Sequence, residues 1–141
     1  MKTMTFWGRE DTDERLLVEC MSGLKTATCT PKVWMEEEEM SYVGDLFEVY
    51  TKLGELACLI EITEVYEIPF GDIKGEVGEK IAKGENSTLD EYIKDHIFTW
   101  EQPLNEQGYG FGKDTRIIVE HFRLVESYID YRGIPAYEPR D

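Results

Sequence analysis

The sequence predicts an α+β fold, in which a small mixed or curled β-sheet carries helices at its ends. Some segments place apolar residues at helical spacing, and others are rich in the β-branched and aromatic residues that favour strands. The helical and extended segments do not alternate regularly along the chain. A doubly wound parallel sheet, which needs that alternation, is therefore not expected.

The first predicted helix follows Asp11 or Thr12, either of which can cap it. An apolar stripe at helical spacing runs along this helix, formed by Leu16, Leu17, Cys20 and Met21. Gly23 supplies the left-handed residue that often ends a helix. Residues 25–29, which include β-branched threonines, are then expected to be extended.

The middle of the chain predicts two strands and a weaker helix. Residues 44–50 and 55–68 have strand composition and are joined by a short turn, and Pro69 ends the second strand. Apolar residues at helical spacing follow over 70–81, where glycines weaken the pattern. The acidic run 35–40 is expected to be a solvated loop, because short blocks of like charge are usually exposed.

The strongest helical signal covers residues 85–100. Thr88 and Glu91 have the spacing of a capping box. One helical face collects the apolar residues and a histidine, namely Leu89, Tyr92, Ile93, His96, Ile97 and Trp100. The glycine-rich loop 105–114 does not follow a strand of a βαβ unit, so it is a weak candidate for a phosphate cradle. A long strand is predicted over 115–128.

Length and composition predict one domain over residues 1–141, with an irregular tail from about residue 127. No apolar run approaches the roughly 20 residues that a membrane span needs, and the start has no signal-peptide pattern. Cys20, Cys29 and Cys58 are scattered, so neither a disulfide framework nor a zinc site is expected. These features predict a reduced, cytoplasmic protein without a metal or cofactor.

The charge balance limits the kinds of partner. The chain has 15 basic and 30 acidic residues, a formal net charge of −15. Proteins that bind along a phosphate backbone draw most of their affinity from cations that displace counterions. The acidity therefore argues against duplex DNA or long RNA as a partner. A small nucleoside-like ligand, or a short single strand of RNA in a local pocket, stays open.

Lys25, Thr28 and Glu85 are the residues best suited to chemistry. Lys25 follows a helix stop, where side chains often project into a cleft, and Thr28 lies three residues further on. A desolvated lysine can act as a base toward a hydroxyl, while a glutamate near a helix start could supply or relay a proton. Spacing alone favours a simpler alternative, in which Lys25 offsets an acidic surface and Thr28 fills a strand position. His96 and His121 are expected to be structural, since neither has a partner at a diagnostic spacing.

The residues Gly23, Lys25 and Thr28 match the Gly-x-Lys-x-x-Thr signature that follows the first helix in the ASCH domain family. The chain resembles the longer bacterial branch of this family from Phe6 to about Glu126. Its further matching segments come in the expected order: "FWG", "VGDLFEVY", "CLIEITEVYEIPF", "GENSTLDEYIKDH" and "VEHFRLVE". The resemblance implies a PUA-like fold, a small closed or nearly closed β-barrel flanked by helices.

The resemblance also implies an activity. A shorter branch of the family contains amidohydrolases that remove the acetyl group from N4-acetylcytidine. On that pattern Lys25 is the proton acceptor, Thr28 the nucleophile, and Glu85, in the run "ENSTL", the proton donor. Residues near these positions are expected to contact the substrate, namely Thr26, Thr30, Trp34 and Asn86. Thr30 stands where many members have an arginine.

Two alternatives stay open. A non-catalytic module could bind RNA or a nucleotide by stacking on Trp34, Tyr109 or Phe111. A ribonuclease would need a base and a phosphate-binding cation in one pocket, and the arginine absent at position 30 counts against it. The loose cations near the proposed cleft are Lys32, Lys113 and Arg116.

Overall fold

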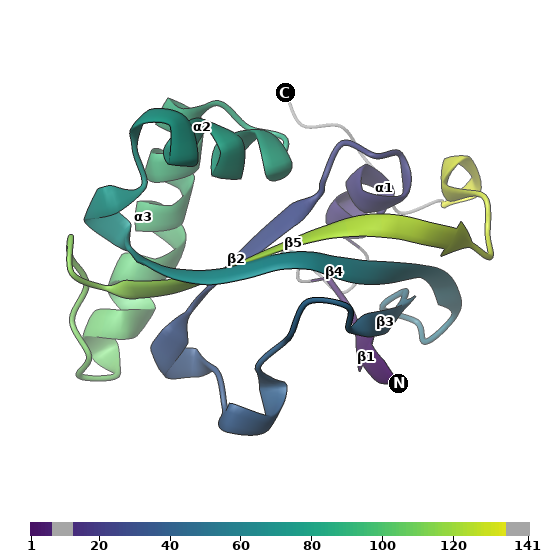
Figure 1. Cartoon of the computed structure of the whole chain (residues 1–141), viewed down its shortest axis with the longest axis horizontal. Coiled ribbons are helices and arrows are strands. Elements are labelled where there is room, and N and C mark those ends of the chain that lie inside the picture. The colour runs from purple at the N-terminus through teal and green to yellow at the C-terminus, as the bar shows by residue number, and fades with distance from the viewer. Residues whose placement is uncertain (7–12, 135–141) are drawn as a thin grey trace.

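A five-stranded sheet forms the centre of the computed structural model, which describes residues 1–6 and 13–134 (Figure 1). The strand order is β1-β3-β4-β5-β2, with β1 parallel to β3 and every other pair antiparallel. The strands are β1 (Lys2–Met4), β2 (Ala27–Pro31), β3 (Leu46–Tyr50), β4 (Leu56–Pro69) and β5 (Arg116–Ser127). The α+β class is confirmed, and so are the four predicted strands.

The expected β-barrel is wrong, because the sheet stays open between its edge strands β1 and β2. Each edge strand is short, and the two halves of the sheet are offset. The β3 strand pairs with residues 56–61 of β4, whereas β2 pairs with β5 opposite residues 64–68 of β4. The two edges therefore lie along different halves of the long β4–β5 pair and do not meet. The three-residue β1 was missed, since it is too short to show a strand periodicity.

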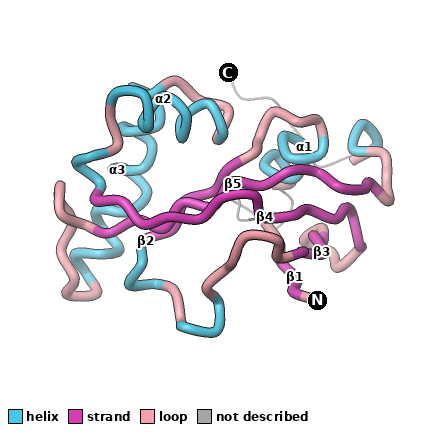
Figure 2. Tube along the Cα trace, in the orientation of Figure 1, coloured by secondary structure: helices cyan, strands magenta, loops and turns pink. Residues whose placement is uncertain are grey.

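Three helices flank the sheet, α1 (Arg15–Met21), α2 (Gly75–Gly84) and α3 (Leu89–Glu106). In Figure 2, α2 and α3 lie at one end of the long strands and α1 lies toward the other. The residues predicted to cap α1, Asp11 and Thr12, lie outside the described residues. Thr88 caps α3 as predicted, with its Oγ1 accepting from the Glu91 N–H at 3.2 Å.

The α3 helix continues past the predicted end at residue 100, and Pro103 lies within it. No helix in the described residues has the length and apolar character to span a membrane. The chain leaves the sheet after Ser127, and the predicted tail beyond residue 134 lies outside the described part.

Two apolar clusters fill the space between helices and sheet. One joins α1 to the end of the sheet that carries β1 and β3, around Leu17, Met21, Val49, Ile60 and Phe122. The other joins α2 and α3 to the opposite end, around Ile81, Tyr92, Trp100, Leu104 and Val119. The predicted face of α3 is thus the packed one, and its His96 ring stacks on Tyr92 with centroids 4.0 Å apart.

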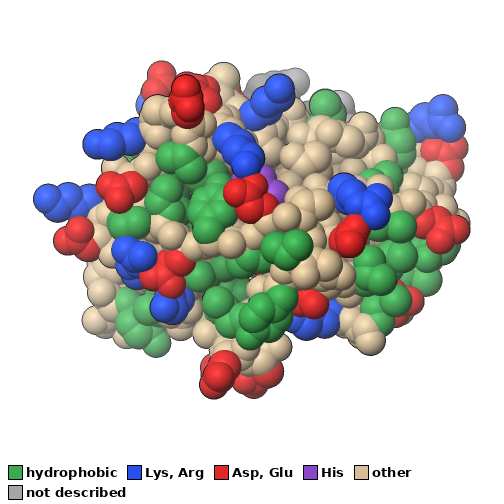
Figure 3. Space-filling view, viewed as in Figure 1, with side chains coloured by type: hydrophobic (Ala, Val, Ile, Leu, Met, Phe, Trp, Pro, Cys, Tyr) green, Lys and Arg blue, Asp and Glu red, His purple; other side chains and the backbone are tan. Residues whose placement is uncertain are grey.

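The connection between β2 and β3 lies away from the helices, on the other side of the long strands (Figure 1). It contains two short 3-10 turns, Lys32–Trp34 and Glu37–Glu39. The acidic run is exposed, as predicted, and Figure 3 shows acidic side chains at the tip of this projecting segment. This connection forms one wall of the cleft that is described next.

Candidate functional site

Lys25 is held at the junction between α1 and β2. Gly23 has a φ of +85°, which ends the helix, and the backbone N–H groups of Leu24 and Lys25 then donate to the Glu19 carbonyl. The Lys25 side chain is only 2% exposed, and its Nζ donates to the Ala27 carbonyl at 2.5 Å. The helix stop therefore turns the lysine into the protein, instead of onto an acidic surface.

Glu85 reaches the same place from the end of α2. Its Oε1 lies 3.5 Å from Lys25 Nζ, and its Oε2 lies 3.5 Å from His96 Nε2 on α3. Sixty residues separate Lys25 from Glu85 in the chain, so the fold itself creates this pairing. His96, which sequence reasoning placed only in the core, is the further member of this site.

The charges around Glu85 outweigh its burial. Burial raises the pKa of the carboxyl, but the Lys25 ammonium, the His96 ring and the Cys29 thiol lower it, and the net pKa is about 2. Glu85 is therefore a carboxylate at neutral pH. Burial, with Glu85 nearby, raises the pKa of the Cys29 thiol well above its ordinary value, so that thiol stays neutral. We call Lys25, Cys29, Glu85, Tyr92 and His96 the Lys25–Glu85 cluster.

Thr28 lies on the opposite side of β2 from this cluster. Side chains alternate between the two faces of a strand. Ala27 packs against Gly84 of α2, and Cys29 contacts Glu85 and Tyr92, so this face of β2 is turned toward the helices. Thr28 and Thr30 point the other way.

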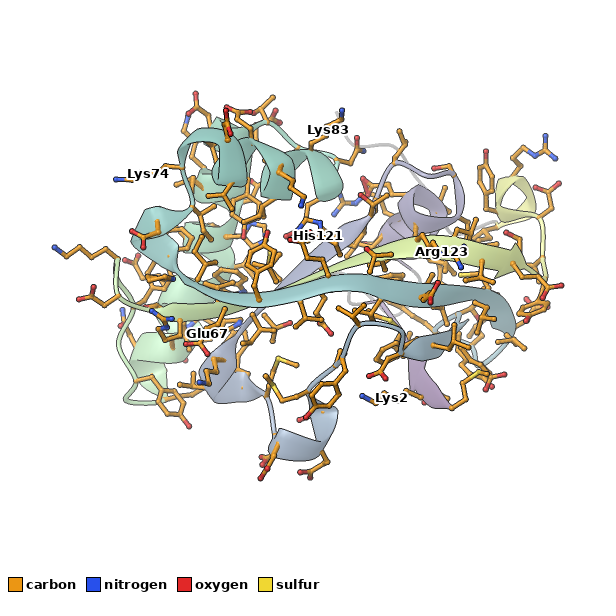
Figure 4. The ribbon with its side chains drawn as sticks, viewed as in Figure 1. Lys2, Glu67, Lys74, Lys83, His121 and Arg123 are labelled. Carbon is orange, nitrogen blue, oxygen red and sulfur yellow. The ribbon has the colours of Figure 1, made fainter. Side chains whose placement is uncertain are left out.

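The threonine face of β2 borders a cleft of about 490 Å³ between the sheet and the β2–β3 connection. Its lining includes Thr28, Thr30 and Trp34. The Trp34 Nε1 donates to Gln107 Oε1 at 2.5 Å. Lys2 of β1 extends toward the connection (Figure 4), where its Nζ donates to Asp45 Oδ2 and to the Met40 carbonyl.

The structure thus divides the predicted site into two groups. Lys25 and Glu85 meet in the cluster, whereas Thr28, Thr30 and Trp34 line the cleft, whose lining includes neither Lys25 nor Glu85. The remaining predicted substrate contacts are outside that lining too. The Thr26 N–H donates to the Gly84 carbonyl, and Asn86 Nδ2 donates to Glu19 Oε1 at 2.9 Å.

Three of the residues suggested for RNA binding, namely Lys32, Arg116 and Phe111, contact other side chains of the protein. Lys32 and Arg116 both pair with Glu67, at 2.8 and 2.5 Å, so one carboxylate offsets part of their combined charge. Phe111 packs on Phe70, with ring centroids 5.0 Å apart. Of the three suggested stacking residues, Trp34 is the one that lines the cleft.

Sequence reasoning missed two polar residues in the cleft, Glu120 and Ser41. Burial raises the pKa of the Glu120 carboxyl. The nearby Ser41 hydroxyl offsets part of this effect, but it makes no hydrogen bond of good geometry within the described residues. The signal that could have found Glu120 is its place in the apolar run "IIVEHF", where a carboxylate must be buried. Within residues 1–6 and 13–134, no group of three or more His, Cys, Asp or Glu could hold a metal ion.

Comparisons with known proteins identify the family. The crystal structure of an ASCH domain from Lactobacillus crispatus JV V101 has a TM-score of 0.74 at 24% identity, covering 89% of this chain and 80% of that one. A protein from Enterococcus faecalis V583 has a TM-score of 0.71 at 22% identity, covering 92% and 84%. No curated protein matches the chain. A family model for the ASCH domain matches residues 2–126, the region from β1 through nearly all of β5, and the chain therefore belongs to the ASCH domain family.

Proposed function

We propose that this protein is an amidohydrolase that removes an acyl group from a small modified nucleoside such as N4-acetylcytidine. The observation that carries the proposal is the buried contact between Lys25 and Glu85. A buried ion pair costs several kcal/mol in lost hydration, so it is weak evidence for a stabilising role and more in keeping with a functional one. The adjoining cleft, at about 490 Å³, has the size of a small-molecule site.

The free edge of β2 lies between the cleft residues, which include Thr28, and the Lys25–Glu85 cluster. The Phe122 N–H donates to the Thr26 carbonyl, so that carbonyl points toward β5. The next carbonyl, of Ala27, points toward the open edge of the sheet, where Lys25 Nζ binds it. This carbonyl carbon is bonded to the Thr28 nitrogen. A substrate held in the cleft against Thr28 would need to reach only around this edge to meet the cluster.

In the proposed reaction, Lys25 first passes its proton to Glu85, and the resulting amine accepts the proton of the Thr28 hydroxyl as that oxygen attacks the acyl carbon. Glu85 is ionised at rest, so the proton that it gives to the leaving amine must first come from Lys25. Breaking the C–N bond leaves an ester on Thr28 and releases the amino nucleoside. Water then hydrolyses the ester, which restores the hydroxyl and releases the acid.

The test is release of cytidine from N4-acetylcytidine by the purified protein. Lys25→Met, Thr28→Val and Glu85→Gln should each lower the rate by about 100-fold or more, since each removes a group that transfers a proton or attacks. Lys83→Met is the matched control, because Lys83 is an exposed lysine on α2 (Figure 4) and should keep full activity. No release by the wild type would contradict the proposal for this substrate.

A second candidate is a module that binds a nucleoside or a short single strand without hydrolysis. The observation that favours it is the separation of Thr28 from the Lys25–Glu85 cluster on the two faces of β2. Binding would then rest on Trp34 and the polar cleft residues, with little help from cations. We would expect binding without turnover, and an affinity that changes little with salt concentration.

A further inference from the structure

The inner part of the cleft contains two buried polar side chains that the proposed reaction does not use. Glu120 on β5 lies directly opposite Thr28 of the neighbouring strand β2, and it is 9% exposed. Ser41, from the β2–β3 connection, is 4% exposed. Both line the cleft. They belong to different segments of the chain, so their meeting is a property of the fold.

These two groups have unused hydrogen-bonding capacity. The Ser41 hydroxyl lies near enough to Glu120 to lower the pKa of its carboxyl, but it makes no hydrogen bond of good geometry in the described part of the chain. Glu120 makes no ion pair there either, although the Lys2 ammonium, which is paired with Asp45, is near enough to lower the pKa of its carboxyl. Buried polar groups are normally paired, and a group left without a partner weakens the fold. A ligand that pairs with them would remove that penalty.

The walls around this polar pair are apolar and partly aromatic. Trp34, Phe47 and Phe122 contribute rings, and Ile60 and Ile62 contribute branched chains. Flat rings suit such walls, because aromatic side chains stack on them. A ligand that satisfies both features is a flat heterocycle with polar groups on one edge.

We infer that Glu120 and Ser41 bind the edge of a nitrogen heterocycle that carries an amino or amide N–H beside a ring-nitrogen acceptor. The carboxylate accepts from the N–H, as Asp and Glu do from the amino group of cytosine, and the Ser41 hydroxyl donates to the ring nitrogen. A carbonyl in place of the N–H would face the carboxylate as a second acceptor. An acylated amino group keeps one N–H, so the proposed substrate can donate the same hydrogen bond to Glu120. The inference therefore rests on the proposed function and deepens it by assigning selectivity to Glu120.

Cytidine and uridine are matched probes, since they are equal in size and uncharged and present an amino group or a carbonyl at the same ring position. Their affinities are measured by protein-observed NMR titration at pH 8, which favours the carboxylate form of Glu120. We expect the wild type to bind cytidine about 10-fold more tightly than uridine. In Glu120→Gln, whose amide can donate to a carbonyl, the ratio should fall to about one or invert.

Glu126→Gln is the control, because it removes the same charge from an exposed position on the same strand, and it should keep the wild-type ratio. Ser41→Ala should weaken cytidine binding and leave thermal unfolding close to that of the wild type. The amide signals of Thr28 and Thr30 should shift on titration.

Three results would overturn the inference: the same ratio in wild type and Glu120→Gln, shifts confined to sites outside the cleft, or no binding of either nucleoside. Cytidine binding does not require hydrolysis, so either the proposed activity or the proposed role of Glu120 can fail while the other stands. A selective cleft without amide hydrolysis contradicts only the enzyme. Hydrolysis with an unchanged ratio in Glu120→Gln contradicts only the role of Glu120.

Discussion

Glu85 shows how opposing effects on one side chain decide its chemistry. Burial alone would raise the pKa of this carboxyl and make it an acid with a proton to give. The charged and polar neighbours reverse that direction and hold the pKa at about 2. Any role in protonating a leaving group therefore depends on Lys25, which lies 3.5 Å away. The pKa of Glu85 is therefore a property of the pair and not of one residue.

The acid stability of the protein should report on this pair. The pKa of Glu85 in the folded state, about 2, is below its ordinary value of 4.5, so its ionised form stabilises the fold. That contribution is complete above about pH 4.5 and is lost as the pH falls toward 2. We expect the free energy of unfolding to drop over this range, and to drop less steeply in Glu85→Gln.

Denaturant unfolding followed at several pH values measures this slope. Glu79→Gln, which removes an exposed carboxylate from the same helix, should keep the steep dependence of the wild type. Equal slopes in the wild type and Glu85→Gln would show that Glu85 does not titrate as the charges around it indicate.

Among the secondary-structure elements, the closest contact near the site is between α2 and β2. A Cβ placed on Gly84 would lie 2.6 Å from the Ala27 Cβ, which is too close for two carbons. The absence of a side chain at Gly84 lets the end of α2 approach β2, and this approach carries Glu85 to Lys25. The glycine therefore has a positional role beyond its weak helix propensity.

Gly84→Ala should push α2 away from β2, lower the free energy of unfolding by about 1–3 kcal/mol and reduce activity by separating Glu85 from Lys25. Adding Ala27→Gly removes the opposing methyl group and should recover part of both losses. Thermal unfolding and the cytidine-release assay measure the two effects. Gly112→Ala is the control, since a Cβ there meets nothing within 4 Å. If the double variant is no better than Gly84→Ala, the methyl contact is not the cause.

Local sequence patterns predict most of the helices and strands, but they do not show whether the two edges of the sheet meet. The composition of residues 55–68 and the capping box at Thr88 are properties of neighbouring residues, and both predictions are confirmed. Closure of the sheet depends instead on which half of β4 each edge strand approaches, and no local pattern records that. The barrel was expected from resemblance, and the offset between β2 and β3 prevents it.

At the scale of the whole molecule, the contacts within the candidate site also depend on the tertiary fold, which local patterns do not describe. Their chemistry and the family resemblance both grouped Lys25 with Glu85, but no spacing predicts their contact, since the tertiary fold brings α2 back to β2. Strand periodicity alone would have placed Thr28 and Cys29 on opposite faces, which the structure confirms. Glu120 could have been noticed as a carboxylate in an apolar strand, but its neighbour Ser41 comes from a loop that no periodicity describes.

The net charge of −15 acts on the molecule as a whole. Acidic residues outnumber basic ones two to one, so repulsion remains after surface ion pairs such as Lys2–Asp45 and Arg123–Glu61 are formed. Salt screens repulsion between exposed charges and weakens those ion pairs as well, but each exposed pair contributes little. The repulsion should dominate because of the large excess of like charge.

We therefore expect the melting temperature to rise as NaCl increases from about 0.02 to 0.5 M, where the screening length falls from about 20 Å to below 5 Å. Thermal unfolding followed by circular dichroism at neutral pH measures this change. KCl should give the same rise at equal ionic strength, since screening depends on ionic strength and not on the cation. A melting temperature that falls with salt would mean that specific ion pairs, and not the overall acidity, dominate the electrostatic stability of this fold.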